Sequence, residues 1–185
     1  MFLYHGTHAV IGTINLGMCR NRTDFGKGFY LTDKVGTAQA WAIRKVELSG
    51  GSPTVIQYEV DDNLFELHGK RFNNIPELEW LIFICDNRRK YTHNAPIHEP
   101  RHEYNWVSGP IANDKIVDVV DEYLNNEISD VEAIRRSRAL PATYQLSLHT
   151  QMSIRFLMKV AHCTGNSKRD TGHRNGAFAN AILLS

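Results

Sequence analysis

The chain has 185 residues, of which 42% are hydrophobic and 22% charged, and its formal net charge is +1. This composition is that of an ordinary globular protein, and the small charge gives no overall attraction to nucleic acid or membranes. No apolar stretch approaches the roughly 20 residues of a membrane-spanning helix, and no signal peptide is visible. Three widely spaced cysteines argue against a disulfide framework or a clustered zinc site and predict a cytoplasmic protein.

The first part of the chain predicts two short strands separated by a loop. Residues 2–4 are apolar and suit a strand that carries His5 at its carboxyl end. Residues 8–24 contain glycines and small polar residues among scattered apolar ones, which indicates a loop with at most one short helix. Residues 29–31 predict the second strand, because two aromatic residues precede a leucine.

A helix and a longer strand are predicted next. The helix runs through Val46, with Asp33 or Thr37 as its candidate N-cap and the glycine pair at 50–51 as its stop signal. Residues 54–60 largely alternate between apolar and polar side chains and are rich in β-branched residues, so they predict a strand.

The middle of the chain predicts three helices and one loop. Pro76 begins the first helix, whereas residues 88–103 are rich in histidine, arginine and proline and indicate an exposed loop. Asp114 opens a helix with one apolar face, and the capping box at 129–132 begins another that ends near Arg138.

The last part of the chain predicts one more strand and one more helix. The strand covers residues 144–149 and the helix covers residues 151–160. Strands and helices without a strict βαβ alternation favour an α+β fold. We therefore expect one domain over residues 1–160, followed by a basic, mobile tail at 161–185 whose apolar residues 177–184 dock as a short element.

Two short segments near the start carry the chemically informative residues. They are Y-H-G-T at residues 4–7 and D-F-G-K-G-F-Y-L-T at residues 24–32. His5 stands next to a glycine whose backbone can approach a ligand, and Tyr30 and Trp41 offer two aromatic faces for a flat ring. The usual glycine-rich nucleotide motifs are absent. The residues therefore predict a nicotinamide dinucleotide site without a phosphate-binding glycine loop.

The two segments resemble the diphtheria-toxin-like and poly(ADP-ribose) polymerase-like branch of the ADP-ribosyltransferase superfamily. They are most similar to a small bacterial group with a D-F-G-x-G-F-Y stretch, and the resemblance extends from Phe2 to about Phe156. It implies an α+β fold with a split β-sheet core flanked by helices. It also implies a mono-ADP-ribosyltransferase that uses NAD as a substrate, needs no metal, and breaks the nicotinamide–ribose bond.

The resemblance also implies roles for individual residues. His5 would hydrogen-bond the adenosine ribose, and the backbone of Gly6, with Thr7 beside it, would hold the nicotinamide carboxamide. Tyr30 and Trp41 would enclose the nicotinamide ring.

The third position of the superfamily's signature triad, after His5 and Tyr30, is often a glutamate. Gln145 is the best match here and Gln151 is the alternative. A glutamine can orient the ribose 2′-hydroxyl, but it carries no charge to stabilise the oxocarbenium-like transition state. We therefore expect transfer of single ADP-ribose units rather than polymer growth.

Three further positions bear on the comparison with the superfamily. Arg20 would reach the pyrophosphate through its forked donors. Ala38 stands where the polymerase-like pattern has a serine. Asp114 is a candidate base for the acceptor, or simply the N-cap of its helix.

Several alternatives remain at this point. His5 could be an ordinary strand-end histidine, Tyr30 and Trp41 could be core aromatics, and Gln145 could be a plain strand residue. The histidines at 93, 98 and 102 have metal-like spacing, but Pro96 and Pro100 interrupt the helix that would align them, which favours a solvated loop.

The resemblance leaves the biological context open among several kinds of partner. It suggests a bacterial toxin, within a toxin–antitoxin pair or in phage defence, that modifies a protein, a nucleic acid or a small molecule and is neutralised by an antitoxin. A decayed module that binds NAD, ADP-ribose or nucleic acid without catalysis is the main alternative. An RNA 2′-phosphotransferase is a third possibility.

Overall fold

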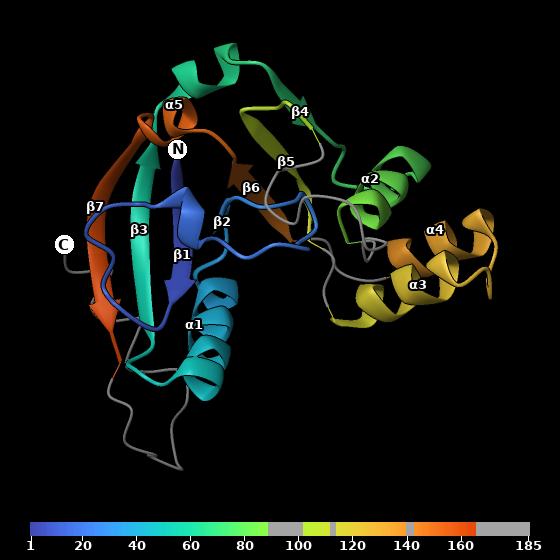
Figure 1. Cartoon of the computed structure of the whole chain (residues 1–185), viewed down its shortest axis with the longest axis horizontal. Helices are drawn as coiled ribbons and strands as arrows, with labels where there is room; N and C mark the ends of the chain where they lie inside the picture. Colours follow the sequence, from blue (N-terminus) through green and yellow to red (C-terminus); the bar gives the residue numbers. More distant parts are fainter. Residues whose placement is uncertain (89–101, 112–113, 140–142, 166–185) are drawn as a thin grey trace. The chain divides into compact units, whose positions relative to one another are not determined.

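The computed structural model describes residues 1–88, 102–111, 114–139 and 143–165. These residues form seven strands and five α-helices, so the predicted α+β class is confirmed (Figure 1). The chain separates into two compact units. The first holds Met1–Ile14, Leu31–Leu64 and the chain from Arg155 onward, and the second holds Asn15–Tyr30 and Phe65–Ile154.

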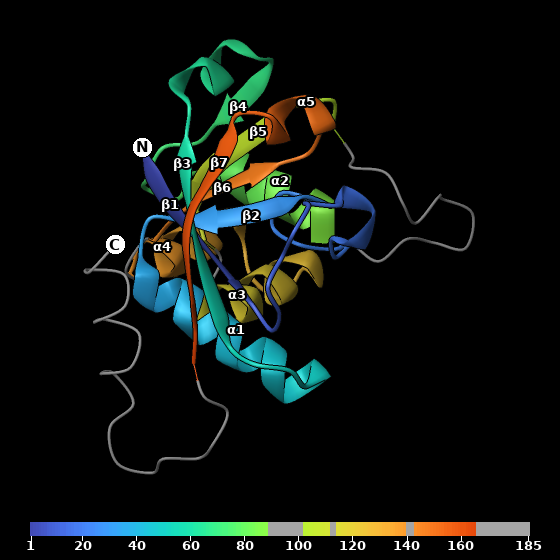
Figure 2. The same cartoon turned by 90° about the vertical axis from the view of Figure 1, so that its left-hand side faces the viewer.

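Three antiparallel strands form most of the sheet in the first unit. They are β1 (Phe2–Thr7), β3 (Thr54–Val60) and β7 (Leu157–Thr164), with β3 in the middle (Figures 1 and 2). The strand predicted at residues 54–60 is confirmed with the same bounds. Its side chains at 55, 56, 58 and 60 are almost fully buried, so local β propensity and tertiary packing agree here.

The strand β2 (Phe29–Thr32) is one residue longer than predicted, and its last two residues belong to the first unit. Thr32 pairs with Tyr4 of β1, which is the one register position that joins these two strands. By contrast, β1 pairs with β3 at every residue from Phe2 to Thr7. The carboxyl half of β1 therefore extends beyond its ladder with β2.

The helix α1 (Val35–Ser49) packs closely against β1 and β3. Ala38 and Ala42 are buried in a small apolar cluster with Val55. Gly6 of β1 allows this approach, because a Cβ atom at position 6 would lie 1.9 Å from the Ala38 carbonyl oxygen. A glycine on the strand and alanines on the helix thus bring the two backbones together.

The start of α1 differs from the prediction, whereas its end does not. The N-cap residue is Lys34, which is extended and makes no side-chain capping bond. The prediction of Asp33 or Thr37 as the N-cap was therefore wrong. Thr37 lies inside the first turn, where its N–H donates to the Lys34 carbonyl at 3.0 Å. Gly50 ends the helix with φ of 71°, a left-handed conformation that glycine adopts without steric cost.

The helix predicted over residues 151–160 is wrong beyond its first turn. Only Gln151–Ile154 is helical (α5), and Leu157 begins the strand β7, which continues past residue 160 to Thr164. β7 pairs with β3 from Val60 opposite Leu157 to Thr54 opposite Thr164. Hydrogen bonds to a strand about a hundred residues earlier therefore override the local helical pattern. The rest of the predicted tail, from residue 166 onward, lies outside the described residues.

The second unit contains two strands that were not predicted, besides one that was. β5 (Trp106–Pro110) pairs in parallel with β4 (Gly69–Arg71) and antiparallel with β6 (Tyr144–Leu148). β4 has only three residues, and β5 is buried at every position and contains a Gly-Pro pair, so neither shows period-two alternation. β6 confirms the strand predicted at residues 144–149, one residue shorter than expected.

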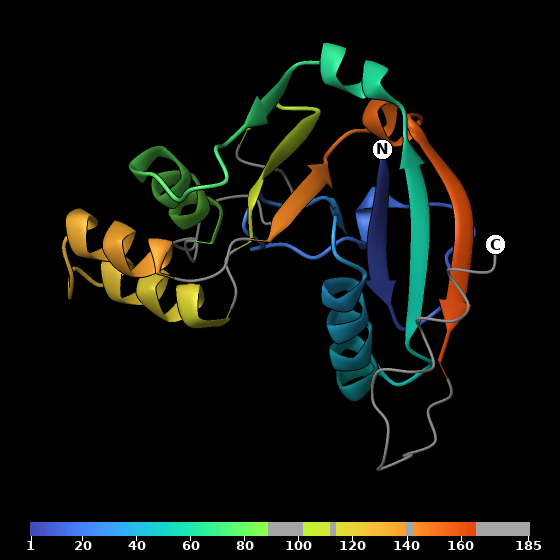
Figure 3. The same ribbon diagram turned by 180° about the vertical axis from the view of Figure 1, so that it is seen from behind.

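Three helices complete the second unit, namely α2 (Leu78–Arg88), α3 (Asp114–Leu124) and α4 (Asp130–Arg138), and α3 contacts α4 (Figure 3). The predicted capping residue is confirmed, because the Ser129 hydroxyl accepts a hydrogen bond from the Glu132 N–H at 3.3 Å. Their apolar faces enclose one buried core, whose members are Phe25, Phe72, Trp80, Leu81, Ile84, Cys85, Val107, Ile116, Val119, Val120 and Ala133.

Substitution of Gly6 by alanine should destabilise the protein, because the new methyl group would meet a backbone oxygen that moves only if α1 moves. We expect the free energy of unfolding to fall by about 1–3 kcal/mol or more in urea denaturation. Gly36→Ala is the matched control, since nothing lies within 4 Å of its Cβ position. It should raise stability by about 0.5–1 kcal/mol, and equal effects of the two substitutions would contradict the tight contact.

Candidate functional site

The first unit holds four of the predicted site residues. His5, Gly6 and Thr7 occupy the carboxyl half of β1, and both His5 and Thr7 are buried. The Gly6 carbonyl accepts a hydrogen bond of 2.7 Å from the Nζ atom of Lys45 on α1. An ammonium group therefore lies at the backbone that the sequence analysis assigned to the nicotinamide carboxamide.

Trp41 lies on α1 and keeps 39% of its surface exposed. The guanidinium of Arg44, one turn further along the helix, lies 5.5 Å from the centre of the indole ring. Such a cation–π contact is favourable and tends to hold the ring in place. This exposure and orientation make the ring of Trp41 available to a ligand.

Tyr30 belongs to the second unit, where its hydroxyl is fixed by the loop that precedes it. The hydroxyl donates to the Gly26 carbonyl at 2.7 Å and accepts from the Phe25 N–H at 2.9 Å. Thr23 Oγ1 lies 2.8 Å away. Burial raises the pKa of the phenol far above its ordinary value. Tyr30 thus stays neutral and its ring is fixed to residues 23–26.

Gln145 and Asp24 meet in the interior of the second unit. The Nε2 atom of Gln145 donates to Asp24 Oδ2 at 2.9 Å and to the Pro110 carbonyl at 3.3 Å. The other carboxylate oxygen of Asp24 accepts from Arg88, with 2.9 Å to Nε and a second contact to Nη2. Asp24 is only 6% exposed, so these partners compensate a carboxylate that is removed from water.

Sequence reasoning missed Asp24 and Arg88 as members of this cluster. Asp24 is the first residue of the D-F-G-K-G-F-Y segment, so the motif itself contained the signal. Arg88 is the last residue of α2 and had been assigned to an exposed loop. Its contact with Asp24 joins residues 64 positions apart, a pairing that no local pattern indicates.

Two histidines, both in neutral form, hold the same loop from another side. Nδ1 of His149 must carry a proton, because it lies 2.9 Å from the Lys27 carbonyl, which can only accept. Nε2 of His149 then accepts from the Ser147 hydroxyl at 2.8 Å. Burial, and secondarily the repulsion that a protonated His102 would exert on a protonated His149, lowers the pKa of His149 to about 3.

His102 makes the equivalent contact with a carbonyl two residues earlier in the loop, that of Phe25. Its Nε2 atom donates to the Phe25 carbonyl at 2.8 Å, and its Nδ1 atom accepts from the Tyr104 N–H at 3.3 Å. The rings of His102 and His149 are nearly perpendicular, with centres 4.6 Å apart. Burial lowers the pKa of His102 as well. Both imidazoles act as neutral donors to backbone carbonyls of the loop.

The second unit therefore brings Tyr30 and Gln145 to one loop, residues 23–30, which Arg88, His102 and His149 also hold. Arg20 is exposed in the segment after the short turn Leu16–Met18, and Gln151 is exposed at the start of α5. Asp114 begins α3, and its side chain lies outside the described residues, as do His93 and His98. The predicted site residues are thus divided between the two units.

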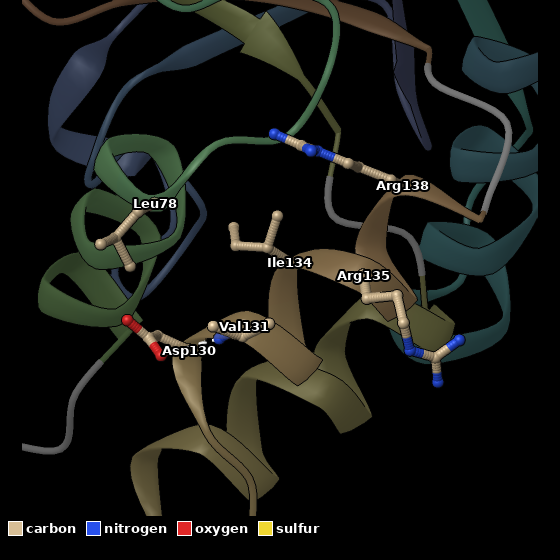
Figure 4. Close-up of a pocket in the computed structure, with 6 residues that line it drawn as sticks. All are labelled: Leu78, Asp130, Val131, Ile134, Arg135 and Arg138. Carbon is tan, nitrogen blue, oxygen red and sulfur yellow. Dashed lines mark hydrogen bonds between the residues drawn. The ribbon is translucent and has the colours of Figure 1, made fainter.

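Other features of the described residues do not add to the site. No group of three histidine, cysteine, aspartate or glutamate side chains there has an arrangement that could hold a metal ion. A groove of about 480 Å³ lies between α2 and α4 (Figure 4). Its lining is formed by Leu78, Asp130, Val131, Ile134, Arg135 and Arg138, none of which was a candidate.

The described helices were also compared with the length and hydropathy that a membrane span requires. None of them is both long enough and apolar enough to cross a bilayer.

Acid should destabilise the protein through the two buried histidines. Between pH 6.5 and about 3, an unfolded chain binds a proton at position 149 that the folded protein does not bind. The free energy of unfolding should therefore decrease as the pH falls through this window, by up to about 1.4 kcal/mol per pH unit for each such histidine. Urea denaturation at several pH values measures this slope.

His149→Gln should reduce the slope, because the substitution removes one titrating group. His162→Gln is the control, since His162 is exposed on β7. If the natural protein and the position 149 variant showed the same pH slope, the histidine would not be buried in its neutral form.

Comparison with known proteins gives a family and no further relatives. No curated protein and no solved structure matches the chain. A family model described as "Protein of unknown function (DUF3990)" matches residues 1–158. Since this match covers most of the chain, the protein belongs to the DUF3990 family.

Proposed function

We propose that the protein is an NAD-dependent mono-ADP-ribosyltransferase of the DUF3990 family. The observation that carries the proposal is the meeting of Tyr30 and Gln145 at residues 23–30. The Tyr30 hydroxyl binds atoms of Thr23, Phe25 and Gly26, and the Gln145 amide binds the intervening Asp24. The resemblance assigns both residues to the signature triad. It does so from two separate segments, residues 24–32 for Tyr30 and residues 144–149 for Gln145.

The reaction requires the protein to fix nicotinamide while positive charge grows on the ribose. Tyr30 and Trp41 are the aromatic side chains for the first task. Gln145 is the residue for the second, because its amide can orient the 2′-hydroxyl of the nicotinamide ribose. The leaving nicotinamide takes the bonding electron pair, and a nucleophile on the acceptor forms the new bond to C1′.

The pairing of β1 supports recognition of the carboxamide by backbone groups. His5, Gly6 and Thr7 pair with Ile56, Val55 and Thr54 of β3. An extended backbone of this kind carries both N–H and C=O groups, the two kinds of group that an amide needs as partners. The Lys45 ammonium at the Gly6 carbonyl would share or give up its acceptor when NAD binds.

The chemistry of Gln145 restricts the acceptor. A glutamine cannot remove a proton, so the acceptor must be a good nucleophile already or must find its base elsewhere. Asp114, on α3, stays a candidate for that base. We propose transfer of single units onto a protein, a nucleic acid or a small molecule in the cytoplasm, as expected of a bacterial toxin or defence effector with a neutralising antitoxin.

A second candidate function is an NAD or ADP-ribose binding module that performs no transfer. The bonds of Gln145 favour it, because Asp24 and Pro110 engage the amide in the protein alone. A residue with these partners can be explained as part of the core. NAD binding in calorimetry without release of nicotinamide would identify this module.

The proposed activity is tested by release of free nicotinamide from NAD, with the natural protein compared to Trp41→Ala. We expect kcat/KM to fall about two- to tenfold, because an aromatic stack contributes about 0.5–1.5 kcal/mol. The partial exposure of Trp41 means that the substitution should leave the fold intact.

Leu48→Ala is the matched control, because Leu48 is an exposed apolar residue of the same helix. It should release nicotinamide at the rate of the natural protein. Absence of NAD cleavage by the natural protein, with a lysate present to supply acceptors, would remove the proposal.

A further inference from the structure

The amide group of Gln145 has one orientation that its surroundings permit. Asp24 Oδ2 and the Pro110 carbonyl oxygen both face Nε2, at 2.9 and 3.3 Å. A glutamine amide has two N–H donors on its nitrogen and only acceptor capacity on its oxygen. If nitrogen and oxygen were exchanged, Oε1 would face a carboxylate and a carbonyl. Both N–H groups are therefore committed to protein acceptors.

The charge of Asp24 is also fixed by its neighbours. Arg88 donates to Oδ1 through two nitrogens, and arginine stays protonated at all relevant pH values. Such a fork of charge-assisted bonds pairs the carboxylate with a cation and fixes its orientation. Donors thus converge on Asp24 from two sides, because Arg88 donates to Oδ1 and Gln145 donates to Oδ2.

We infer that Asp24 is a positioning residue that sets the orientation of Gln145 and excludes a glutamate at position 145. The amide nitrogen faces Asp24, so Oε1 is the atom that remains for a ligand, and it can only accept. Under the proposed function, on which this part of the inference rests, Oε1 would accept a hydrogen bond from the ribose 2′-hydroxyl.

A glutamate at position 145 should have the opposite effect here from the one that the resemblance implies. Replacement of Gln145 by glutamate would restore the residue that the superfamily often has at this position. Here it would place a second carboxylate against Asp24, and two carboxylates at hydrogen-bond distance cannot both be ionised without strong repulsion. The substitution should therefore damage the protein rather than improve it.

The decisive experiment compares Gln145→Glu, Asp24→Asn and the double variant. The double variant keeps the total charge and restores a hydrogen bond between positions 24 and 145, although the bond from position 145 to the Pro110 carbonyl is lost. The asparagine introduced at position 24 can accept from Arg88 through its side-chain oxygen and donate through its amide nitrogen to the carboxylate introduced at position 145. We expect each single variant to lower Tm by roughly 5–10 °C at pH 7 and the double variant to regain most of that loss.

A control substitution and a pH series separate this effect from a general loss of packing. Gln57→Glu makes the same chemical change in the strand β3 and should have a small effect that Asp24→Asn does not rescue. Beside Asp24, the pKa of the introduced glutamate would be raised, so the folded protein would bind a proton that the unfolded chain lacks. The Tm deficit of Gln145→Glu should therefore grow as the pH rises from about 4 toward 7.

The outcomes distinguish this inference from the proposed function. Additive losses in the double variant, or a deficit in Gln145→Glu that does not change with pH, would overturn the inference whether or not NAD is cleaved. If Gln145→Glu does not fold, recovery of folded protein in the double variant supports the inference and its failure to fold contradicts it.

Kinetics then test the link to catalysis. If the natural protein releases nicotinamide, Gln145→Glu should reduce kcat more than it changes KM, and the double variant should recover at least part of kcat. If the natural protein releases none, the proposed function fails, while the Tm and pH series still decide the role of Asp24.

Discussion

The buried carboxylate of Asp24 is the interaction on which the arrangement of the second unit depends. A charge with so little exposure is tolerated only when it is paired and fully hydrogen-bonded. Arg88 on α2 and Gln145 on β6 provide those bonds, and both must be in place at once. A helix, a strand and the loop at residues 23–30 are therefore tied to one group: loss of Arg88 would leave its charge uncompensated, and loss of Gln145 would remove the donor to Oδ2.

The rest of that loop is held by neutral polar groups. His102 and His149 donate to the carbonyls of Phe25 and Lys27, and the Tyr30 hydroxyl donates to that of Gly26. Three successive carbonyls, those of Phe25, Gly26 and Lys27, thereby receive side-chain donors. Protonation would leave these donors in place but would remove the acceptor nitrogens that the Tyr104 N–H and the Ser147 hydroxyl use, so the hydrogen bonds around the loop depend on pH. Side chains distant in the sequence thus complete the hydrogen bonds of the loop that carries Tyr30.

The candidate residues of the two units differ in their chemistry. The first unit holds the extended backbone of His5–Thr7, an ammonium group at Lys45 and the exposed ring of Trp41. The second supplies Tyr30 and an amide that is neutral and fixed in orientation. Position 145 carries no charge to stabilise the transition state. Catalysis would therefore depend largely on how the protein positions the substrate. This division agrees with transfer to an acceptor that needs little activation.

The sequence by itself determined the elements whose signals are local. The strand at residues 54–60, the Gly50 stop and the Ser129 cap were predicted because alternation, positive φ and capping act within a few residues. It also singled out Tyr30 and Gln145, although nothing in either segment showed that both bind residues of the loop at 23–26. Only the tertiary structure decided that residues 157–164 form a strand, and that Asp24 meets Arg88 and Gln145. Those outcomes depend on partners tens to more than a hundred positions away, and pairing energy between remote segments leaves no periodic pattern in the chain.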